Sequence, residues 1–216
     1  MPWRRWDVVT IEVERNERDT RRESWKIAGS KGEWEGLVEK IEVVGRIESR
    51  AERRNLAGNL TDACVNVLSQ TRRSLGIIKP EAIHRTYFRD NPRYGEMWQL
   101  GLPGLTELED VQLKRDFPHE LRIQYTCPEC QTKSGSHDQQ VLEWGFYEWM
   151  RTNPDNIEQV WENAGFAQED TDIYLFVGNQ AAHLTSFMVI SVLRVLSGSV
   201  NRPLFPLQKA PTDVSP

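Results

Sequence analysis

Apolar and polar residues alternate along several stretches of this 216-residue chain, and the alternation predicts half-buried β-strands. In the first half it is clearest from Asp7 to Arg15, where Val9, Ile11 and Val13 fall on one side of the extended chain. Further strands are predicted at Glu23 to Ile27, Lys40 to Ile47 and Ala82 to Arg89. In the second half they are predicted at Leu121 to Thr126, Asp172 to Val177 and Phe187 to Leu196. The last of these contains too many apolar residues for an exposed edge strand.

Other stretches carry apolar residues at helical spacing, or are charged with few β-branched residues, and these predict helices. The predicted helices are Ser49 to Asn55, Asn59 to Gln70, Ser136 to Arg151 and Asn156 to Asn163. The third begins with a Ser-x-x-Gln capping pattern, which places His137 in its first turn. Its predicted core face consists of Leu142, Gly145, Phe146 and Trp149.

These elements give an expectation for the fold class and for the domains. They predict an α+β protein with mixed, mainly antiparallel sheets, a few helices on one sheet face and a turn that contains a Cys-x2-Cys motif. Two domains are expected, a β-rich domain at residues 1–110 and an α+β domain at residues 111–200, followed by an extended tail at residues 201–216. The junction is placed in the irregular stretch from Pro92 to Asp110.

Composition narrows the class of protein. Apolar residues make up 38% of the chain and charged residues 27%, which is typical of a folded, soluble protein. No apolar run is long enough for a membrane span, and the N-terminal residues lack the apolar segment of a secretion signal. The chain is therefore expected in the cytoplasm without a membrane partner, and its three cysteines are expected to be free thiols.

Positive charge gathers in the first part of the chain. Residues 1–80 carry 16 Lys and Arg against 13 Asp and Glu, whereas the remainder carries 11 against 19. This bias, with neighbouring tryptophans, indicates contact with nucleic acid, because arginine binds phosphates and tryptophan stacks on bases. The candidate nucleic-acid-binding residues are Arg4, Arg5, Arg21, Arg22, Trp25, Lys26, Arg53 and Arg54. In the alternative interpretation, these side chains pair with interspersed carboxylates on a solvated surface.

The most specific chemistry lies between Cys127 and His137. A Cys-x2-Cys spacing lets both sulfur atoms reach one tetrahedral ion, so Cys127, Cys130 and His137 are predicted to bind zinc. The fourth ligand could be Cys64, Asp138, another histidine or water. Two alternatives need no metal, namely a turn with unpaired thiols and a site of cysteine redox chemistry.

No familiar catalytic motif accompanies this turn. The chain has no Gly-rich phosphate loop, no nucleophile elbow and no His-Glu-x-x-His helix. Glu143 and Glu148 point in different directions from the core face of the predicted helix, so they do not form a paired acid and base. Both are interpreted as surface carboxylates.

Several blocks of sequence resemble an uncharacterised prokaryotic protein family. They are an Arg-x-Glu-Ser-aromatic element at Arg21 to Trp25, the block Ser74 to Pro80, the two cysteines and the histidine before a helix, and the hairpin block Phe176 to Asn179. The resemblance covers about residues 6–196 and implies no particular activity. Where the family pattern has Asp-Trp-Glu, this chain has Glu-Trp-Gly at residues 143–145, so a carboxylate pair would be incomplete here.

Three functions fit these observations. The first is a zinc-stabilised binding or accessory module that contacts nucleic acid or a nucleic-acid-processing complex. The second is a metal-dependent, nuclease-like hydrolase in which Asp138 or Glu143 positions water at an open metal site. The third is an assembly subunit whose aromatic residues and proline-containing tail contact other proteins.

Overall fold

The structure of the chain is a computed structural model that describes residues 3–17, 19, 21–28, 34–92, 94, 117–130, 132–166, 170–180 and 182–196. The first elements are β1 (Asp7–Ile11), β2 (Val13–Arg15), β3 (Trp25–Ile27), α1 (Trp34–Glu39), β4 (Ile41–Arg46) and α2 (Arg50–Asn59). They are followed by β5 (Thr61–Asp62), α3 (Val65–Gln70), β6 (Leu75–Ile78), β7 (Ala82–Asp90), β8 (His119–Thr126) and β9 (His137–Val141). The last are α4 (Trp144–Thr152), the 3₁₀ helix η1 (Pro154–Asn156), α5 (Gln159–Ala164), β10 (Thr171–Gln180) and β11 (His183–Leu196).

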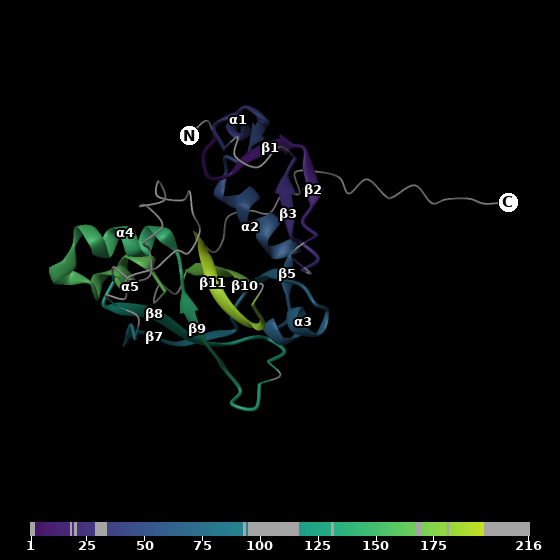
Figure 1. The fold of residues 1–216 in the computed structure, drawn as a ribbon. Helices are drawn as coiled ribbons and strands as arrows, with labels where there is room; N and C mark the ends of the chain where they lie inside the picture. Colours follow the sequence, from purple (N-terminus) through teal and green to yellow (C-terminus); the bar gives the residue numbers. More distant parts are fainter. Residues whose placement is uncertain are drawn as a thin grey trace.

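One seven-stranded sheet, in the order β5-β6-β10-β11-β9-β8-β7, forms the centre of the molecule. Most neighbouring strands are antiparallel, whereas β5 with β6 and β9 with β11 run parallel. Two antiparallel ribbons, β1 with β4 and β2 with β3, lie outside this sheet. Figure 1 shows α1 and the strands β1 to β3 above the large sheet. Helices α4 and α5 lie together on the left of the same view. The predicted α+β class with mainly antiparallel sheets is confirmed.

The alternation of side chains along β10 separates two cores, because successive residues of a strand point to opposite sheet faces. Ile173, Leu175 and Val177 belong to the larger core, which also receives buried side chains from α3, α4 and α5. Tyr174 belongs to the smaller core, where Ala57 of α2 packs against β11. Burial of each large apolar side chain stabilises the folded state by about 1.5–3 kcal/mol relative to leaving it exposed to water. Helices α3 to α5 therefore share one sheet face, and α2 covers the other.

The large sheet takes strands from both sides of residue 110, where the domain boundary is expected. β7 and β8 pair along their length, from Ala82 opposite Thr126 to Asp90 opposite His119. The expected boundary thus falls in the connection between two neighbouring strands of one sheet. Residues 95–116, which contain most of the expected junction, and the expected tail at 201–216 lie outside the described residues.

The largest error in the predicted elements concerns the helix expected from Ser136 to Arg151. Residues 137–141 form β9 instead, and α4 begins only at Trp144. His137, Gln139 and Val141 face the core, but two of these three are polar, so the alternation typical of a strand is hidden. The inward Gln139 is accommodated because the Tyr125 hydroxyl donates a 2.7 Å hydrogen bond to its Oε1 atom. The prediction that His137 occupies a helical turn is therefore wrong.

Smaller differences concern the ends and number of the elements. The predicted strand at residues 7–15 is divided into β1 and β2, and the predicted helix at residues 59–70 consists of β5 and α3. The pattern does not predict α1 at all. None of the helices in the described part of the chain has the length and hydrophobicity that a membrane crossing requires.

Candidate metal centre

Three potential metal ligands from distant parts of the chain meet inside the larger core. Cys64 is the N-cap residue of α3, Cys127 directly follows β8, and His137 is the first residue of β9. Because Tyr125 lies opposite His137 in the β8–β9 pairing, the end of β8 brings Cys127 next to the imidazole. The donor atoms of the three residues all lie within 4.8 Å of one another. The Cys64 Sγ atom and the His137 Nε2 atom are 3.3 Å apart.

The cluster is buried, and burial shifts the pKa values of Cys127 and His137 so that their neutral forms are favoured. Each of the three residues is at most 8% exposed. Burial raises the pKa of the Cys127 thiol to about 12, although a hydrogen bond from the Val65 backbone acts in the opposite direction. Burial lowers the pKa of His137. A bound cation would replace the thiol protons and so offset the free-energy cost of burying thiolates, since thiolate and neutral imidazole are the forms that bind metals.

Cys130 lies at the edge of this cluster and is not one of its three mutually close donors. Its Sγ atom is 3.1 Å from the Thr132 Oγ1 atom, and its side chain packs against the same core. Burial tends to raise the pKa of its thiol, but hydrogen bonds from Thr132, the Cys127 backbone and Cys64 outweigh this effect and lower it. The structure thus brings together two of the predicted ligands, Cys127 and His137, with Cys64, which the sequence left as one option for the fourth.

The carboxylates that a hydrolytic site would need lie away from the cluster. Asp138 follows His137 in β9, so it points to the opposite sheet face, where Tyr87 and Arg122 donate hydrogen bonds to it. Glu143 is only 7% exposed, and the prediction that it is a surface carboxylate is wrong. Its two oxygens accept hydrogen bonds from Arg5, from the Ser191 hydroxyl and from the backbone N–H of residue 192. Both carboxylates are therefore engaged elsewhere.

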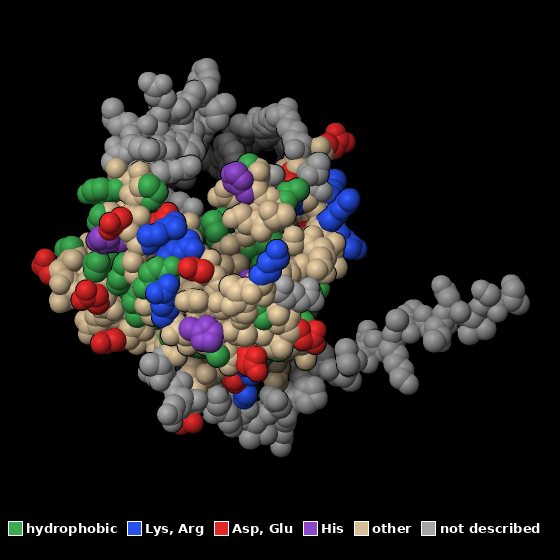
Figure 2. Space-filling model, turned by 90° about the horizontal axis from the view of Figure 1, so that it is seen from below, with side chains coloured by type: hydrophobic (Ala, Val, Ile, Leu, Met, Phe, Trp, Pro, Cys, Tyr) green, Lys and Arg blue, Asp and Glu red, His purple; other side chains and the backbone are tan. Residues whose placement is uncertain are grey.

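Most of the candidate nucleic-acid-binding residues are held by contacts within the chain. Arg21 pairs with Asp19 at 2.5 Å, and Arg54 pairs with Asp172 at 2.5 Å. The remaining internal contacts are Arg5 with Glu143, Lys26 with Glu14, and Arg53 with the Trp6 ring and the Ile47 carbonyl oxygen. Figure 2 shows the lower face of the molecule, away from the N-terminal elements at the top of Figure 1, and basic and acidic side chains are interspersed there.

The other three candidates have exposed side chains, and the two arginines among them form no ion pair with a described residue. These three are Arg4, Arg22 and Trp25. Trp25 is 57% exposed, and the Arg15 guanidinium lies 5.5 Å from its ring centroid. The ribbon of β2 and β3 therefore carries an aromatic surface with cationic groups around it.

Two features are difficult to find from sequence, the metal-ligating position of Cys64 and the burial of Glu143. Cys64 is isolated in the chain, and its only local signal is its position before α3, where its sulfur accepts a 3.4 Å hydrogen bond from the Asn66 N–H. The partners of Glu143 lie 138 and 48 residues away, so no local pattern announces its burial.

Comparison with protein families finds one match. A family model described as a domain of unknown function, DUF8757, matches residues 62–206. This region includes all four cysteine and histidine residues of the candidate metal centre, and it leaves out the ribbons and α2. No functionally curated protein and no solved structure shows significant similarity to the chain. The resemblance to an uncharacterised family is thus confirmed for the region that begins at β5.

Proposed function

The chain belongs to this DUF8757 family, and we propose that it is a binding module whose fold is stabilised by a structural zinc ion. The observation that carries the proposal is the buried cluster of Cys64, Cys127 and His137. Thiolate and imidazole are preferred zinc ligands, and bond lengths of about 2.0–2.3 Å place tetrahedral ligands about 3.5–3.8 Å apart. Movements of about 1 Å would bring the three donors to this spacing. Cys130 would turn from Thr132 to supply the fourth ligand.

A structural role is favoured over hydrolysis by the surroundings of the cluster. Catalytic zinc keeps one position open for water and has a general base nearby. Here the three close donors are buried, Asp138 points to the other sheet face, and Glu143 is occupied by its own partners. A Cys3His set would close the coordination shell with protein ligands. Such a site joins α3 to the β8–β9 hairpin and contributes to folding rather than to catalysis.

Elemental analysis of the untagged protein, purified under reducing conditions, tests the zinc site. We expect one zinc per chain, which Cys127→Ser and His137→Ala abolish and Cys130→Ser weakens. Removal of the metal by a strong chelator should lower the melting temperature by about 10 °C or more, as expected for the loss of several kcal/mol. Ser134→Ala, in the same hairpin loop, is the matched control and should retain the metal. Metal-free wild-type protein with an unchanged melting temperature in chelator would overturn the proposal.

Nucleic acid is the ligand class that we propose for the module, with the β2–β3 ribbon as the contact surface. Trp25 offers an exposed ring for stacking, and Arg22 and Lys26 lie beside it in sequence with exposed side chains. Base stacking on an aromatic residue is worth about 1–3 kcal/mol per base. Since Lys26 also pairs with Glu14 at 2.9 Å, the electrostatic contribution of this ribbon depends mainly on Arg15 and Arg22.

Fluorescence polarisation with a short single-stranded oligonucleotide at several salt concentrations tests this contact. Trp25→Ala should weaken binding about tenfold or more, in line with the loss of one stacked base. Arg22→Ala should reduce the slope of log affinity against log salt concentration by about one, the effect of losing one phosphate contact. Trp144→Ala removes a comparably exposed tryptophan from α4, 54% exposed, and should leave binding unchanged. An equal loss in Trp25→Ala and Trp144→Ala would contradict the ribbon as the interface.

The β1–β4 ribbon favours a second candidate function, contact with a protein partner. Val8, Val9, Val43 and Val44 are each between 39% and 54% exposed. A two-stranded ribbon is marginally stable by itself, so apolar side chains on it are suited to burial against another surface. Light scattering after size exclusion tests self-association through this surface. A larger mass that Val44→Lys reduces to that of one chain would support it, and one chain at all concentrations would count against a second copy as the partner.

A further inference from the structure

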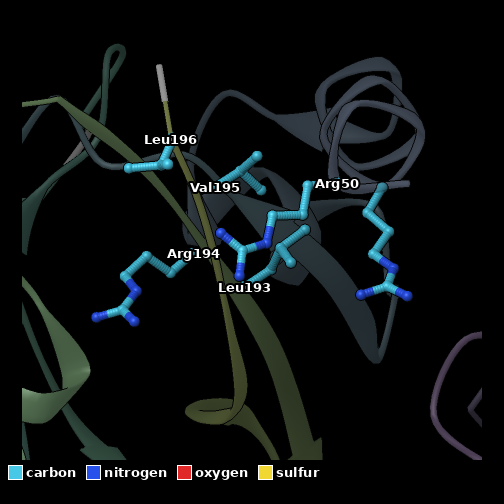
Figure 3. A pocket seen from close by; sticks show the side chains of 6 residues that line it. Arg50, Leu193, Arg194, Val195 and Leu196 are labelled. Carbon is cyan, nitrogen blue, oxygen red and sulfur yellow. The ribbon is translucent and has the colours of Figure 1, made fainter. Parts of the chain in front are cut away.

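A pocket of about 160 Å³ lies between the first turn of α2 and the end of β11. Three arginines and three apolar residues line it, namely Arg50, Arg53, Leu193, Arg194, Val195 and Leu196. None of these six residues is acidic. Figure 3 shows the Arg50 side chain reaching across Leu193 towards β11, while Arg194 extends from the strand in another direction. The pocket therefore combines positive charge from two elements with an apolar wall.

The arginines of this pocket differ from most others in the structure because they form no ion pair with a described residue. Eight arginines elsewhere are paired with carboxylates, namely Arg5, Arg21, Arg46, Arg54, Arg73, Arg89, Arg122 and Arg151. The contrast is sharpest within α2, where Arg54 pairs with Asp172 while its neighbour Arg53 does not pair. Positive charge at the pocket thus remains uncompensated within the described part of the chain.

Two of the three guanidinium groups are held in position by neutral partners. Arg53 donates from Nε to the Ile47 carbonyl oxygen at 3.0 Å and lies over the Trp6 ring. Arg194 donates from Nη1 to the Asn163 carbonyl oxygen at 3.0 Å. These contacts fix the side chains without neutralising them, and they leave other N–H groups for a ligand. A guanidinium group has five N–H donors, so one internal bond does not exhaust it.

The nearest acidic residue of the same helix turn is turned away from the pocket. Glu52 closes the capping box of α2, in which its Oε2 atom accepts a 3.3 Å hydrogen bond from the Ser49 N–H. Glu52 is not among the lining residues. The capping box therefore keeps the carboxylate at the start of the helix and leaves the pocket to Arg50 and Arg53.

We propose that this pocket binds a phosphate monoester, with the phosphate held by the guanidinium groups of Arg50 and Arg53 from α2 and an apolar substituent against Leu196. Guanidinium groups match phosphate oxygens with paired hydrogen bonds, and a phosphate dianion compensates the two positive charges of Arg50 and Arg53 better than a carboxylate does. The volume of about 160 Å³ is well below the roughly 300–1,000 Å³ of sites for whole drug-sized ligands. The pocket thus holds the phosphate head and leaves most of the ligand outside. This site is separate from the zinc cluster and from the β2–β3 ribbon.

Isothermal titration calorimetry with phenyl phosphate and with inorganic phosphate, at constant ionic strength, tests the proposal. Saturable binding with one site is expected, tighter for phenyl phosphate because its ring contacts Leu196. Arg50→Gln should weaken the binding of both ligands about tenfold or more, the effect of losing a charged hydrogen bond. Leu196→Ser should weaken phenyl phosphate more than inorganic phosphate. Both side chains are exposed, so these variants keep the fold.

The control variant is Arg72→Gln, which removes an exposed arginine from the turn after α3 and should not change the binding of either ligand. Benzoate, an aromatic carboxylate, should bind more weakly than phenyl phosphate. Three results would overturn the proposal. They are the absence of saturable binding, an equal loss in Arg72→Gln and Arg50→Gln, and benzoate binding as tight as that of phenyl phosphate.

Discussion

The carboxylate of Glu143 ties together three parts of the chain. Its Oε2 atom accepts hydrogen bonds of 2.6 Å from the Ser191 hydroxyl and 2.9 Å from the Val192 N–H, and its Oε1 atom lies 3.1 Å from the Arg5 Nη2 atom. Buried carboxylates are costly unless all their hydrogen bonds are made. The residue is therefore best understood as a structural acceptor between the start of α4, the N-terminal residues and β11.

For Glu143→Gln we expect the free energy of unfolding to fall by about 1–3 kcal/mol, because a neutral amide replaces a charged acceptor in a buried network. Most of this loss comes from Ser191 and the backbone N–H, since Arg5 is 63% exposed and its ion pair is screened. Urea denaturation measures it. Glu148→Gln is the control, because Glu148 pairs with Arg151 at the surface of α4 and should give a much smaller change. Equal losses in the two variants would contradict the structural role.

Alanine substitutions at Gly165 and Gly135 can separate the energetic cost of backbone strain from that of a side-chain collision. Gly165 ends α5 with a φ of 66°, and a Cβ atom there would collide with the Arg194 guanidinium. Gly135 has a φ of 69°, and nothing lies within 4 Å of its Cβ position. A left-handed backbone conformation costs a non-glycine residue about 1–2 kcal/mol, so Gly135→Ala should lower the free energy of unfolding by this amount.

Gly165→Ala should lose up to about 1 kcal/mol more than Gly135→Ala, because the flexible Arg194 side chain must move and give up its hydrogen bond to the Asn163 carbonyl oxygen. Thermal or urea denaturation of both variants measures the difference. In an Arg194→Ala background the additional loss should disappear, because the colliding group is gone. An additional loss that persists in that background would assign it to the backbone instead.

At the scale of elements, three of the sequence blocks on which the family resemblance rests meet in space, and the last two of them lie within the matched region. In the first block, the Arg21 Nη1 atom donates a 2.7 Å hydrogen bond to the Asn179 carbonyl oxygen of the hairpin block. The Glu23 Oε2 atom accepts hydrogen bonds from the N–H and hydroxyl groups of Ser74, at 3.0 and 2.9 Å. Ser74 in turn accepts a hydrogen bond from the Asn179 N–H. These contacts fix the segment before β3 against β6 and β10.

The pKa of Glu23 gives this junction a pH dependence. Burial tends to raise the pKa, but hydrogen bonds from Ser74 and the charge of Arg73 outweigh it, so the pKa lies below its ordinary value near 4.5. A carboxyl whose pKa is lowered on folding stabilises the protein above its unfolded pKa, and this stabilisation is lost as the pH falls through the folded pKa.

Glu23→Gln should therefore cost about 1–2 kcal/mol at pH 7, as for hydrogen bonds to a charged group that remains partly solvated. The cost relative to wild type should shrink as the pH is lowered below about 4.5, because the wild-type carboxyl then becomes neutral as well. Urea midpoints of both proteins between pH 3 and pH 7, on a roughly one-unit grid, measure it. A difference that stays constant across this range would show that the charge of Glu23 makes no contribution.

Sequence patterns predict some elements of this fold well and others poorly, for identifiable reasons. The strand at residues 121–126 is found because Leu121, Ile123 and Tyr125 are apolar and buried on one face. β9 is missed because its buried face contains His137 and Gln139, whose partners belong to β8 and α3. Local periodicity reports burial only when the buried residues are apolar. The candidate metal ligands within the hairpin are predictable by spacing, whereas the placement of Cys64, about 60 residues earlier, requires the tertiary structure.

At the scale of the whole molecule, the N-terminal elements and the family domain share the smaller core. The family match begins at residue 62, yet Ala57 of α2 and part of the Trp6 side chain pack against Tyr174 and its neighbours in β11. One ion pair reinforces the contact, since Arg54 of α2 binds Asp172 of β10. The chain before residue 62 thus covers a sheet face that would otherwise expose apolar side chains.

Trp6 is the residue through which this attachment can be tested. It has a φ of 75°, which is uncommon for a non-glycine residue, and it is held by the Ile47 N–H, which donates to its carbonyl oxygen, and by Arg53 over its ring. Trp6→Ala keeps the backbone but removes the ring from the smaller core. We expect a loss of roughly 1–3 kcal/mol, less than for a fully buried tryptophan.

Hydrogen exchange read by mass spectrometry should locate this loss. Amides of β1, β4 and α2 should exchange faster in Trp6→Ala, because these elements depend on the smaller core, while amides of β8 and β9 keep the wild-type rate. Trp144→Ala, which removes an exposed tryptophan from α4, should change neither group. Faster exchange in β8 and β9 to the same extent as in α2 would mean that both cores open together. The N-terminal elements would then be part of one cooperative unit with the family domain rather than a layer that can detach from it.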